Sequence, residues 1–331
     1  MKIVVPMAGF GTRLRPHTWS KPKPLVAVAG KPVLGHILDL FAQLPSADEV
    51  VFIVGYRGDQ VQEYVGRAYP HLKARYVEQT DLLGQSHAIW LAREWLTGPL
   101  LVVFVDTLVD TQLGGLPTET ADAVAWVKPV PDPRRFGVAE VGPDGRVIRL
   151  VEKPQDMTNN LAVVGFYYFR QGEKLVQAIE DQIAQRQQLH GEYFLVDAIN
   201  IMLHAGLKMR VEPVSVWNDC GQPESLLATN RYLLEHGRDN SAEVARQPDV
   251  VVVPPVYVDP TAQVRESVIG PHVSIGAGCE IRRSVIQDSI VDEGSLIVDT
   301  TLSESIIGRD ARVIGRYRSL NVGDSSEIGF A

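Results

Sequence analysis

The first residues of the chain gather groups that bind phosphate. A short apolar run, Lys2 to Pro6, leads into a turn with Gly9 and Gly11, and Arg13 follows two residues later. The backbone N–H groups of a glycine turn after a strand can hold phosphate oxygens. Residues 1–38 contain six Lys and Arg side chains and no Asp or Glu, in a chain with 32 basic and 40 acidic residues. An anionic ligand explains this cluster of cations, and we expect a triphosphate at the loop.

Two common phosphate-binding loops do not fit these residues. A dinucleotide fingerprint needs a glycine where Leu14 stands, and a P-loop needs Gly-Lys followed by Ser or Thr. A lone Gly-x-Gly is by itself only a tight turn, so the surrounding charge carries the interpretation.

Strands and helices alternate around this loop. Strand-like runs at 2–6, 50–55, 74–78 and 100–105 are separated by helical patterns at 33–44, 59–68 and 85–96. Such alternation predicts an α/β fold with a mainly parallel sheet, and ligands at the carboxyl ends of its strands. From 123 to 169 the predicted strands are separated by shorter stretches of sequence, which predicts an antiparallel extension of the sheet. Helical patterns resume at 171–186, 193–205 and 223–235.

A different periodicity begins near residue 256. Aliphatic residues recur every five or six positions: Val258, Val264, Ile269, Ile275, Ile281, Ile286, Val291, Ile297, Leu302, Ile307 and Val313. This spacing fits neither a helix nor an ordinary strand, but it suits a three-sided parallel β-helix with one aliphatic side chain inside per face. The pattern resembles the hexapeptide-repeat left-handed β-helix, with a β-sandwich as the alternative. We expect a first domain over 1–236, a polar linker over 237–249 and the short β-helix over 250–331.

Composition narrows the classes of function. A net charge of −8 and a pI near 5.5 argue against sequence-independent nucleic-acid binding. The two cysteines, Cys220 and Cys279, give no disulfide framework and suit a reducing compartment. The apolar runs are shorter than a membrane span. These features predict a cytoplasmic protein without membrane or nucleic-acid partners.

Several motifs occur in the order typical of one enzyme family. "GTRLRPHT" and "PKPLVAVAGKP" are followed by "EQTDLLGQSHA", "FVD", "FGV", "VEKP", "VVGFYYF" and "WNDCGQPESL". Over residues 1–236 the chain resembles the sugar-1-phosphate nucleotidylyltransferases, which have a Rossmann-like fold, and most closely their thymidylyl and uridylyl branch with a C-terminal left-handed β-helix. The resemblance implies transfer of a nucleotidyl group from dTTP or UTP to a sugar 1-phosphate, with glucose 1-phosphate as the default, releasing pyrophosphate. A GTP and mannose 1-phosphate guanylyltransferase, or a non-catalytic regulatory or scaffold protein, are the alternatives.

The resemblance also assigns roles to residues. Arg13 would meet the triphosphate and the leaving pyrophosphate, and Lys23 would draw the two phosphates together. The residues implied to bind the nucleotide are Ala8, Gly9, Gly11, Thr12, Gln79 and Gly84. Gln79 would form hydrogen bonds to the O4 and N3–H edge of uracil or thymine. The alternative is that Gln79 is a surface residue with no role in binding.

The metal and sugar sites follow in the same way. Asp106 and Asp219, far apart in the sequence, would hold Mg²⁺. Relatives often have glycine before this first aspartate, where this chain has Val105. The residues implied to bind the sugar phosphate are Gly137, Glu152, Lys153 and Gly165. Lys153 would also be a catalytic residue. The partners implied are a nucleoside triphosphate and a sugar 1-phosphate, and the β-helix is expected to form a homo-oligomer. The sequence leaves open dTTP versus UTP, the sugar, the pathway, any feedback inhibitor and the oligomer size.

Overall fold

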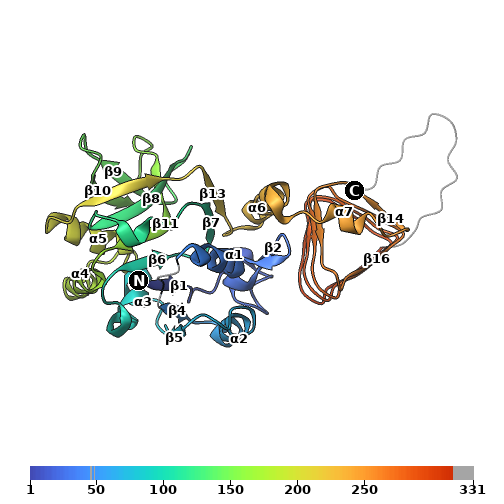
Figure 1. Ribbon diagram of the computed structural model, residues 1–331, viewed down its shortest axis with the longest axis horizontal. Coiled ribbons are helices and arrows are strands. Elements are labelled where there is room, and N and C mark those ends of the chain that lie inside the picture. The colour runs from blue at the N-terminus through green and yellow to red at the C-terminus, as the bar shows by residue number, and fades with distance from the viewer. Residues whose placement is uncertain (45–46, 48, 316–331) are drawn as a thin grey trace. The chain divides into compact units, whose positions relative to one another are not determined.

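The computed structural model describes residues 1–44, 47 and 49–315, which fold as two compact units (Figure 1). The α/β unit comprises residues 1–27 and Lys31–Thr229. The β-helix unit comprises Val28–Gly30 and the chain from Asn230 onward. Among the described residues, no helix is both long and apolar enough to cross a membrane.

A nine-stranded mixed sheet forms the centre of the α/β unit. Its parallel part runs in the order β5-β4-β1-β6, and β11 joins β6 in antiparallel fashion. Beyond β11 lie β9 and β10 on one path and β8 with β12 on another. The strands are β1 Lys2–Pro6, β4 Glu49–Val54, β5 Ala74–Glu78, β6 Leu100–Val103, β8 Ala123–Pro129, β9 Gly137–Val141, β10 Val147–Glu152, β11 Leu161–Phe169 and β12 Met209–Pro213. Short pairs are formed by β2 Ala27–Val28 with β3 Lys31–Pro32 and by β7 Thr107–Asp110 with β13 Val216–Asp219.

The parallel strands are apolar because helices cover both of their faces. Ile3 to Val5 in β1 and Leu100 to Val103 in β6 are all completely buried. Helices α3 Gln85–Leu91, α4 Gly172–Ala184 and α5 Leu195–His204 pack against one another and share one apolar core with these strands. The remaining helices of this unit are α1 Val33–Leu40, α2 Gly58–Ala68 and α6 Pro223–Leu233, the last of which continues into the β-helix unit. The predicted α/β fold and its antiparallel extension are thus confirmed.

Some element ends differ from those expected. The helical pattern at 33–44 becomes α1 followed by a 3₁₀ turn at Phe41–Gln43, and the pattern at 85–96 becomes α3 followed by a 3₁₀ turn at Arg93–Trp95. The strand expected over 100–105 ends at Val103. The Phe104 N–H still donates to the carbonyl of Gly165 in β11 at 2.9 Å, in register with the pairing of Val103 and Phe166, although β6 ends before it.

The C-terminal unit is a parallel β-helix of three sheets, as expected from the aliphatic spacing. Val256 pairs with Val273 and Ser274 with Ile290, so one coil advances by 17 or 16 residues. Three faces per coil explain the spacing of five or six. The sheets are β14 Val250–Val252, β17 Ser267–Ile269, β20 Val285–Ile286 and β23 Thr301–Leu302; β15 Val256–Val258, β18 Val273–Ile275, β21 Ile290–Val291 and β24 Ile306–Ile307; and β16 Gln263–Arg265, β19 Glu280–Arg282, β22 Leu296–Val298 and β25 Arg312–Ile314. Eight of the eleven predicted aliphatic residues are buried in its core, and Leu302, Ile307 and Val313 are partly buried and pack against it.

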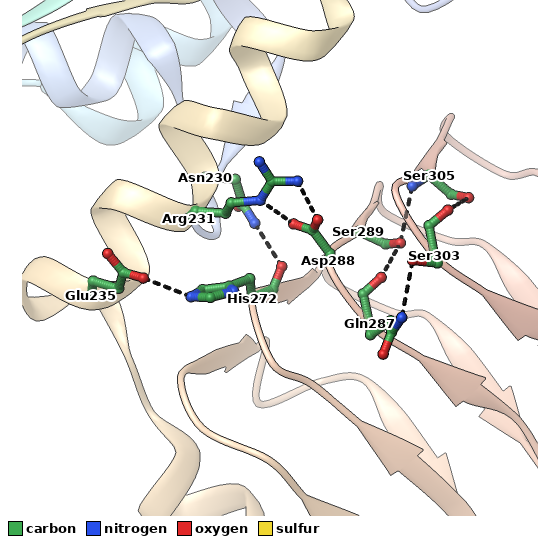
Figure 2. Close-up of polar contacts among 9 residues, drawn as sticks. All are labelled: Asn230, Arg231, Glu235, His272, Gln287, Asp288, Ser289, Ser303 and Ser305. Carbon is green, nitrogen blue, oxygen red and sulfur yellow. Dashed lines mark hydrogen bonds and ion pairs between the residues drawn. The ribbon is translucent and has the colours of Figure 1, made fainter.

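Polar side chains close the corners of the β-helix. The hydroxyl of the fully buried Ser289 donates to the carbonyl of Gln287 at 2.7 Å and accepts from the N–H of Ser305 at 3.1 Å (Figure 2). Serines at successive corners thereby satisfy backbone groups that no strand can pair.

One residue in the last turn of α6 and one just after this helix contact these coils. Arg231 forms an ion pair with Asp288, and Glu235 accepts from His272 Nε2 at 2.8 Å (Figure 2). The stretch 237–249, expected as a linker, contains the short helix α7 Ser241–Val244, and Val244 lies in the β-helix core. The limits of the domains stay predictions.

Candidate active site

The predicted site residues follow the carboxyl ends of the parallel strands. The glycine turn comes after β1, Gln79 directly after β5 and Asp106 shortly after β6. The carboxyl ends of neighbouring parallel strands meet at one edge of a sheet, which is where ligands of such folds bind. Two cavities open at this edge, and both are lined by Pro6, Met7, Gly9 and Phe104.

The first cavity, of about 250 Å³, is lined by both predicted phosphate-binding cations, Arg13 and Lys23. The loop between them is folded tightly. Gly11 has a φ of 62°, and a Cβ added there would lie 2.9 Å from the Cβ of Lys23, so only glycine fits. The hydroxyl of Thr18 donates to the Gly11 carbonyl at 2.8 Å, and Leu14 is fully buried. These contacts hold Arg13 and Lys23 on one wall of the cavity.

A second group of side chains fixes the far end of this loop. The hydroxyl of Tyr56 donates to the Trp19 carbonyl at 2.7 Å, and Arg57 Nε donates to the same oxygen at 3.1 Å. The ring of Phe10 lies 5.8 Å from that of Tyr56. The sequence analysis missed this clamp because Tyr56 and Arg57 lie outside the recognised motifs. The only signal available was their position directly after a parallel strand.

Asp106 and Asp219 are brought together by the pairing of β7 with β13. Asp219 is the partner of Thr107, and the Cys220 N–H donates to the Asp106 carbonyl at 2.8 Å. Lys23 Nζ lies 3.1 Å from Asp106 Oδ2. The Asp219 carboxylate accepts from the Gly221 N–H at 2.7 Å. Asp106 therefore lines the same cavity as Lys23, and Asp219, which is 113 positions away in sequence, lies beside it, two residues before the cavity-lining Gly221.

These carboxylates fit the donor set of a hard cation. Across residues 1–44, 47 and 49–315, no group of three or more His, Cys, Asp or Glu side chains is placed to hold a metal ion. A cation at Asp106 and Asp219 would therefore complete its coordination with water and substrate phosphate, as Mg²⁺ commonly does. Cys220 is no competing ligand, because burial raises the pKa of its thiol to about 12 and keeps it neutral.

The neighbouring lysines are held by the protein itself. Lys31 Nζ forms an ion pair with Asp39 at 2.5 Å and lies 5.6 Å from the centre of the Tyr69 ring. Lys21 is buried, at 3% exposure. For Lys31, this geometry favours the structural role that the sequence left open.

The second cavity, also of about 250 Å³, is lined by Ala8, Gly9, Gln79 and Gly84. Gln79 is 6% exposed, so it is not a surface residue, and its Nε2 donates to the Gly84 carbonyl at 3.2 Å. Gly84 has a φ of 98°, and a Cβ there would lie 2.6 Å from the backbone N of Tyr193. A side chain at this position would therefore displace the backbone beside Gln79.

The predicted sugar residues form a separate group on β9 and β10. A Cβ at Gly137 would lie 3.2 Å from Glu152 Oε2, so the glycine leaves room for this carboxyl group. Burial raises the pKa of Glu152 to about 7; the Lys153 ammonium, 4.0 Å away, opposes the shift, and the carboxylates of Asp197 and Glu192 add to it. Lys153 Nζ also lies 4.8 Å from the centre of the Phe194 ring. Neither cavity is lined by Gly137, Glu152 or Lys153.

Gly165 and Val105 lie next to Phe104, which lines both cavities. Gly165, at a φ of 86°, would bring a Cβ within 3.1 Å of the Cβ of Phe104. Phe104 lines both cavities, and the absence of a side chain at Gly165 leaves room for its ring. Val105 is 6% exposed and lines the first cavity, so a valine is accommodated where relatives often have glycine.

Comparison with known proteins places this geometry in a family. A family model described as "Nucleotidyl transferase" matches residues 2–236, and one described as "GMPPB C-terminal domain" matches residues 252–325. A glucose-1-phosphate thymidylyltransferase of Streptomyces antibioticus is 32% identical, with 99% of each chain covered. The bifunctional protein GlmU of Methanocaldococcus jannaschii is 33% identical over 71% of this chain and 55% of its own.

A solved structure shows the same fold. A UDP-glucose pyrophosphorylase complexed with UDP-glucose superposes with a TM-score of 0.62 at 20% identity, covering 71% of this chain and 98% of that one. The family model covers more than two thirds of the sequence, including the glycine loop, both aspartates and Gln79. The chain belongs to the nucleotidyl transferase family and is a nucleotidyltransferase enzyme.

Proposed function

We propose that this nucleotidyltransferase joins dTTP or UTP to a sugar 1-phosphate, with glucose 1-phosphate as the first candidate, and releases pyrophosphate. The observation that carries the proposal is the first cavity, where Arg13, Lys23 and Asp106 come together beside Asp219. The full-length similarity to a glucose-1-phosphate thymidylyltransferase supports the choice of nucleotide and sugar.

The proposed reaction brings two anions together, so its barrier is mainly electrostatic. The Arg13 guanidinium would bind paired oxygens of the triphosphate and stay with the departing pyrophosphate. Lys23 would exchange its contact with Asp106 for contacts to the α-phosphate and the attacking phosphate oxygen. Mg²⁺, held by Asp106 and Asp219, would supply further charge neutralisation when bound.

The second cavity and the β9–β10 group would orient the two substrates. Gln79 beside Gly84 would bind the base, and Glu152 and Lys153 would bind the sugar hydroxyls and the sugar phosphate. Holding both substrates in line turns an encounter of two free anions into a step within one complex, which is a large catalytic effect.

A second candidate has its own support. The C-terminal match to the GMPPB domain favours GTP and mannose 1-phosphate as the alternative substrate pair. A non-catalytic scaffold is less well supported, because such a protein has no chemical need for Lys23 and Asp106 in one cavity with Asp219 beside them.

The test is a matrix of UTP, dTTP, GTP, ATP and CTP against glucose, mannose and N-acetylglucosamine 1-phosphates, with pyrophosphate release as the readout and Mg²⁺ present or withheld. We expect Mg²⁺-dependent release with UTP or dTTP and glucose 1-phosphate. Lys23→Ala should abolish it, whereas Lys208→Ala, an exposed lysine away from both cavities, should not. Highest activity with GTP and mannose 1-phosphate would select the second candidate, and no release from any pair would refute the enzymatic proposal.

A cytoplasmic location and a homo-oligomer formed through the β-helix remain part of the proposal. Light scattering of the full chain measures the number of subunits per oligomer. The same measurement on a folded chain that ends before Asn230 shows whether the β-helix is needed for assembly.

A further inference from the structure

The amide of Gln79 is held on its nitrogen side by two acceptors. Nε2 lies 3.2 Å from the Gly84 carbonyl oxygen and 3.2 Å from His87 Nδ1. His87 is in α3, between Gln85 and Ala88, which both line the second cavity. The sequence alone does not show that Gln79, Gly84 and His87 are joined by hydrogen bonds.

Hydrogen-bond chemistry fixes the orientation of this amide. A backbone carbonyl only accepts, so the Gln79 atom facing Gly84 must be the NH₂ group. That group has two hydrogens, and the second lies toward His87 Nδ1, which must then carry a lone pair and no proton. With both hydrogens engaged, Oε1 is the group that Gln79 offers to a ligand in the second cavity.

His87 is itself held in the form that can accept. Its ring stacks on Trp90, with centroids 6.1 Å apart and planes 23° apart, and the guanidinium of Arg93, in the 3₁₀ turn after α3, lies 4.0 Å from the centre of the Trp90 ring. Burial lowers the pKa of His87 from its ordinary value of 6.5, while a hydrogen bond to the backbone of Asp81 and the Asp81 carboxylate oppose the shift. The neutral imidazole is therefore favoured at neutral pH.

We infer that His87 is a positioning residue for base selection: by accepting from Gln79 Nε2, it fixes the Gln79 amide with Oε1 toward the base. An acceptor in that place matches the N3–H of uracil or thymine and is mismatched with the bare N3 of cytosine. The inference rests on the proposed function, because it assumes that Gln79 reads a pyrimidine base.

Two substitutions separate hydrogen bonding from packing. His87→Phe keeps an aromatic ring for Trp90 but replaces the acceptor nitrogen with C–H. His87→Asn loses the ring but places a side-chain oxygen close to the former Nδ1. The readout is the ratio of kcat/KM for UTP to kcat/KM for CTP, with His204→Phe, at an exposed position, as the matched control.

We expect His87→Phe to lower this ratio by about tenfold, the effect of one lost hydrogen bond, because a freed Gln79 donor can then serve cytosine N3. His87→Asn should keep the ratio within about threefold of wild type. An unchanged ratio in His87→Phe, with Gln79→Ala strongly lowering it, would overturn the inference and leave the proposed function intact. Equal use of UTP and CTP by the wild-type enzyme would instead refute the proposed selection of uracil or thymine.

A second measurement needs no turnover. Two-bond ¹H–¹⁵N spectra of the full chain report which ring nitrogen carries the proton, and His87→Asn identifies the signal. We expect an unprotonated Nδ1 and a protonated Nε2 at pH 7.5 in the substrate-free protein. A protonated Nδ1 would contradict the inference independently of any activity.

Discussion

Replacing Glu152 with glutamine removes a buried group that titrates near neutral pH. Burial, the first cause, raises its pKa from 4.5 to about 7, and its side chain is only 14% exposed. The folded protein therefore binds the proton more tightly than the unfolded chain does. Ionising Glu152 costs the folded state stability as the pH rises from about 4.5 to about 7, and the cost is complete above pH 7.

The size of this effect follows from the pKa. A shift of roughly 2.5 units corresponds to about 3 kcal/mol. Glutamine has the same shape and no charge, so the variant and the wild type should be similarly stable at pH 4.5. At pH 8, Glu152→Gln should be more stable by about 3 kcal/mol in the transition of the α/β unit.

The assay is urea unfolding of the substrate-free protein at several pH values from 4.5 to 8.5. Glu140→Gln is the matched control, because the ion pair with Arg149 lowers the pKa of Glu140. Across this pH range the wild type should keep a constant advantage over Glu140→Gln, because the stabilisation is lost only at lower pH, as the pH falls through the lowered pKa. A stability difference between Glu152→Gln and wild type that does not change with pH would refute the reasoning.

Other perturbations have separate readouts. Asp106→Asn should lower kcat by about a hundredfold or more in the pyrophosphate assay while circular dichroism shows an intact fold. Gln79→Ala should loosen nucleotide preference in a competition between triphosphates more than it slows the best substrate. Tyr56→Phe removes one hydrogen bond to the Trp19 carbonyl and should raise KM for the triphosphate about five- to tenfold, with a smaller change in kcat, in steady-state kinetics. Leu14→Ala should lower the free energy of unfolding by about 2–5 kcal/mol, measured in urea.

The sequence was most informative where backbone periodicity decides the structure. Alternating apolar and amphipathic runs gave the parallel strands, and a spacing of five or six gave the β-helix. Both patterns involve residues that are close together in the sequence, so they can be recognised in one chain. Strand and helix ends were less predictable: β6 ends at Val103, two residues before the end of the apolar run.

Contacts between distant side chains could not be read from the sequence. The clamp from Tyr56 and Arg57 to Trp19 depends on two loops that meet only in the folded sheet. The orientation of Gln79 depends on His87, and the pKa of Glu152 depends on how deeply it is buried. The motifs therefore identify the candidate residues, whereas their orientations and pKa values depend on contacts that only the structure shows.

The corners of the β-helix show the same limit. Non-glycine residues such as Arg283, Asp288 and Asp299 adopt positive φ there, with Arg283 bonded to Asp299 of the next coil. Their residue types give little sign of a left-handed backbone, because stacking on adjacent coils stabilises it.

The most direct test of the central proposal is a crystal structure of the full chain with Mg²⁺ and a non-hydrolysable UTP or dTTP analogue. The account predicts the triphosphate in the first cavity against Arg13 and Lys23, with the metal ion bound by Asp106 and Asp219. A nucleotide bound elsewhere, or a metal ion that contacts neither aspartate, would contradict it.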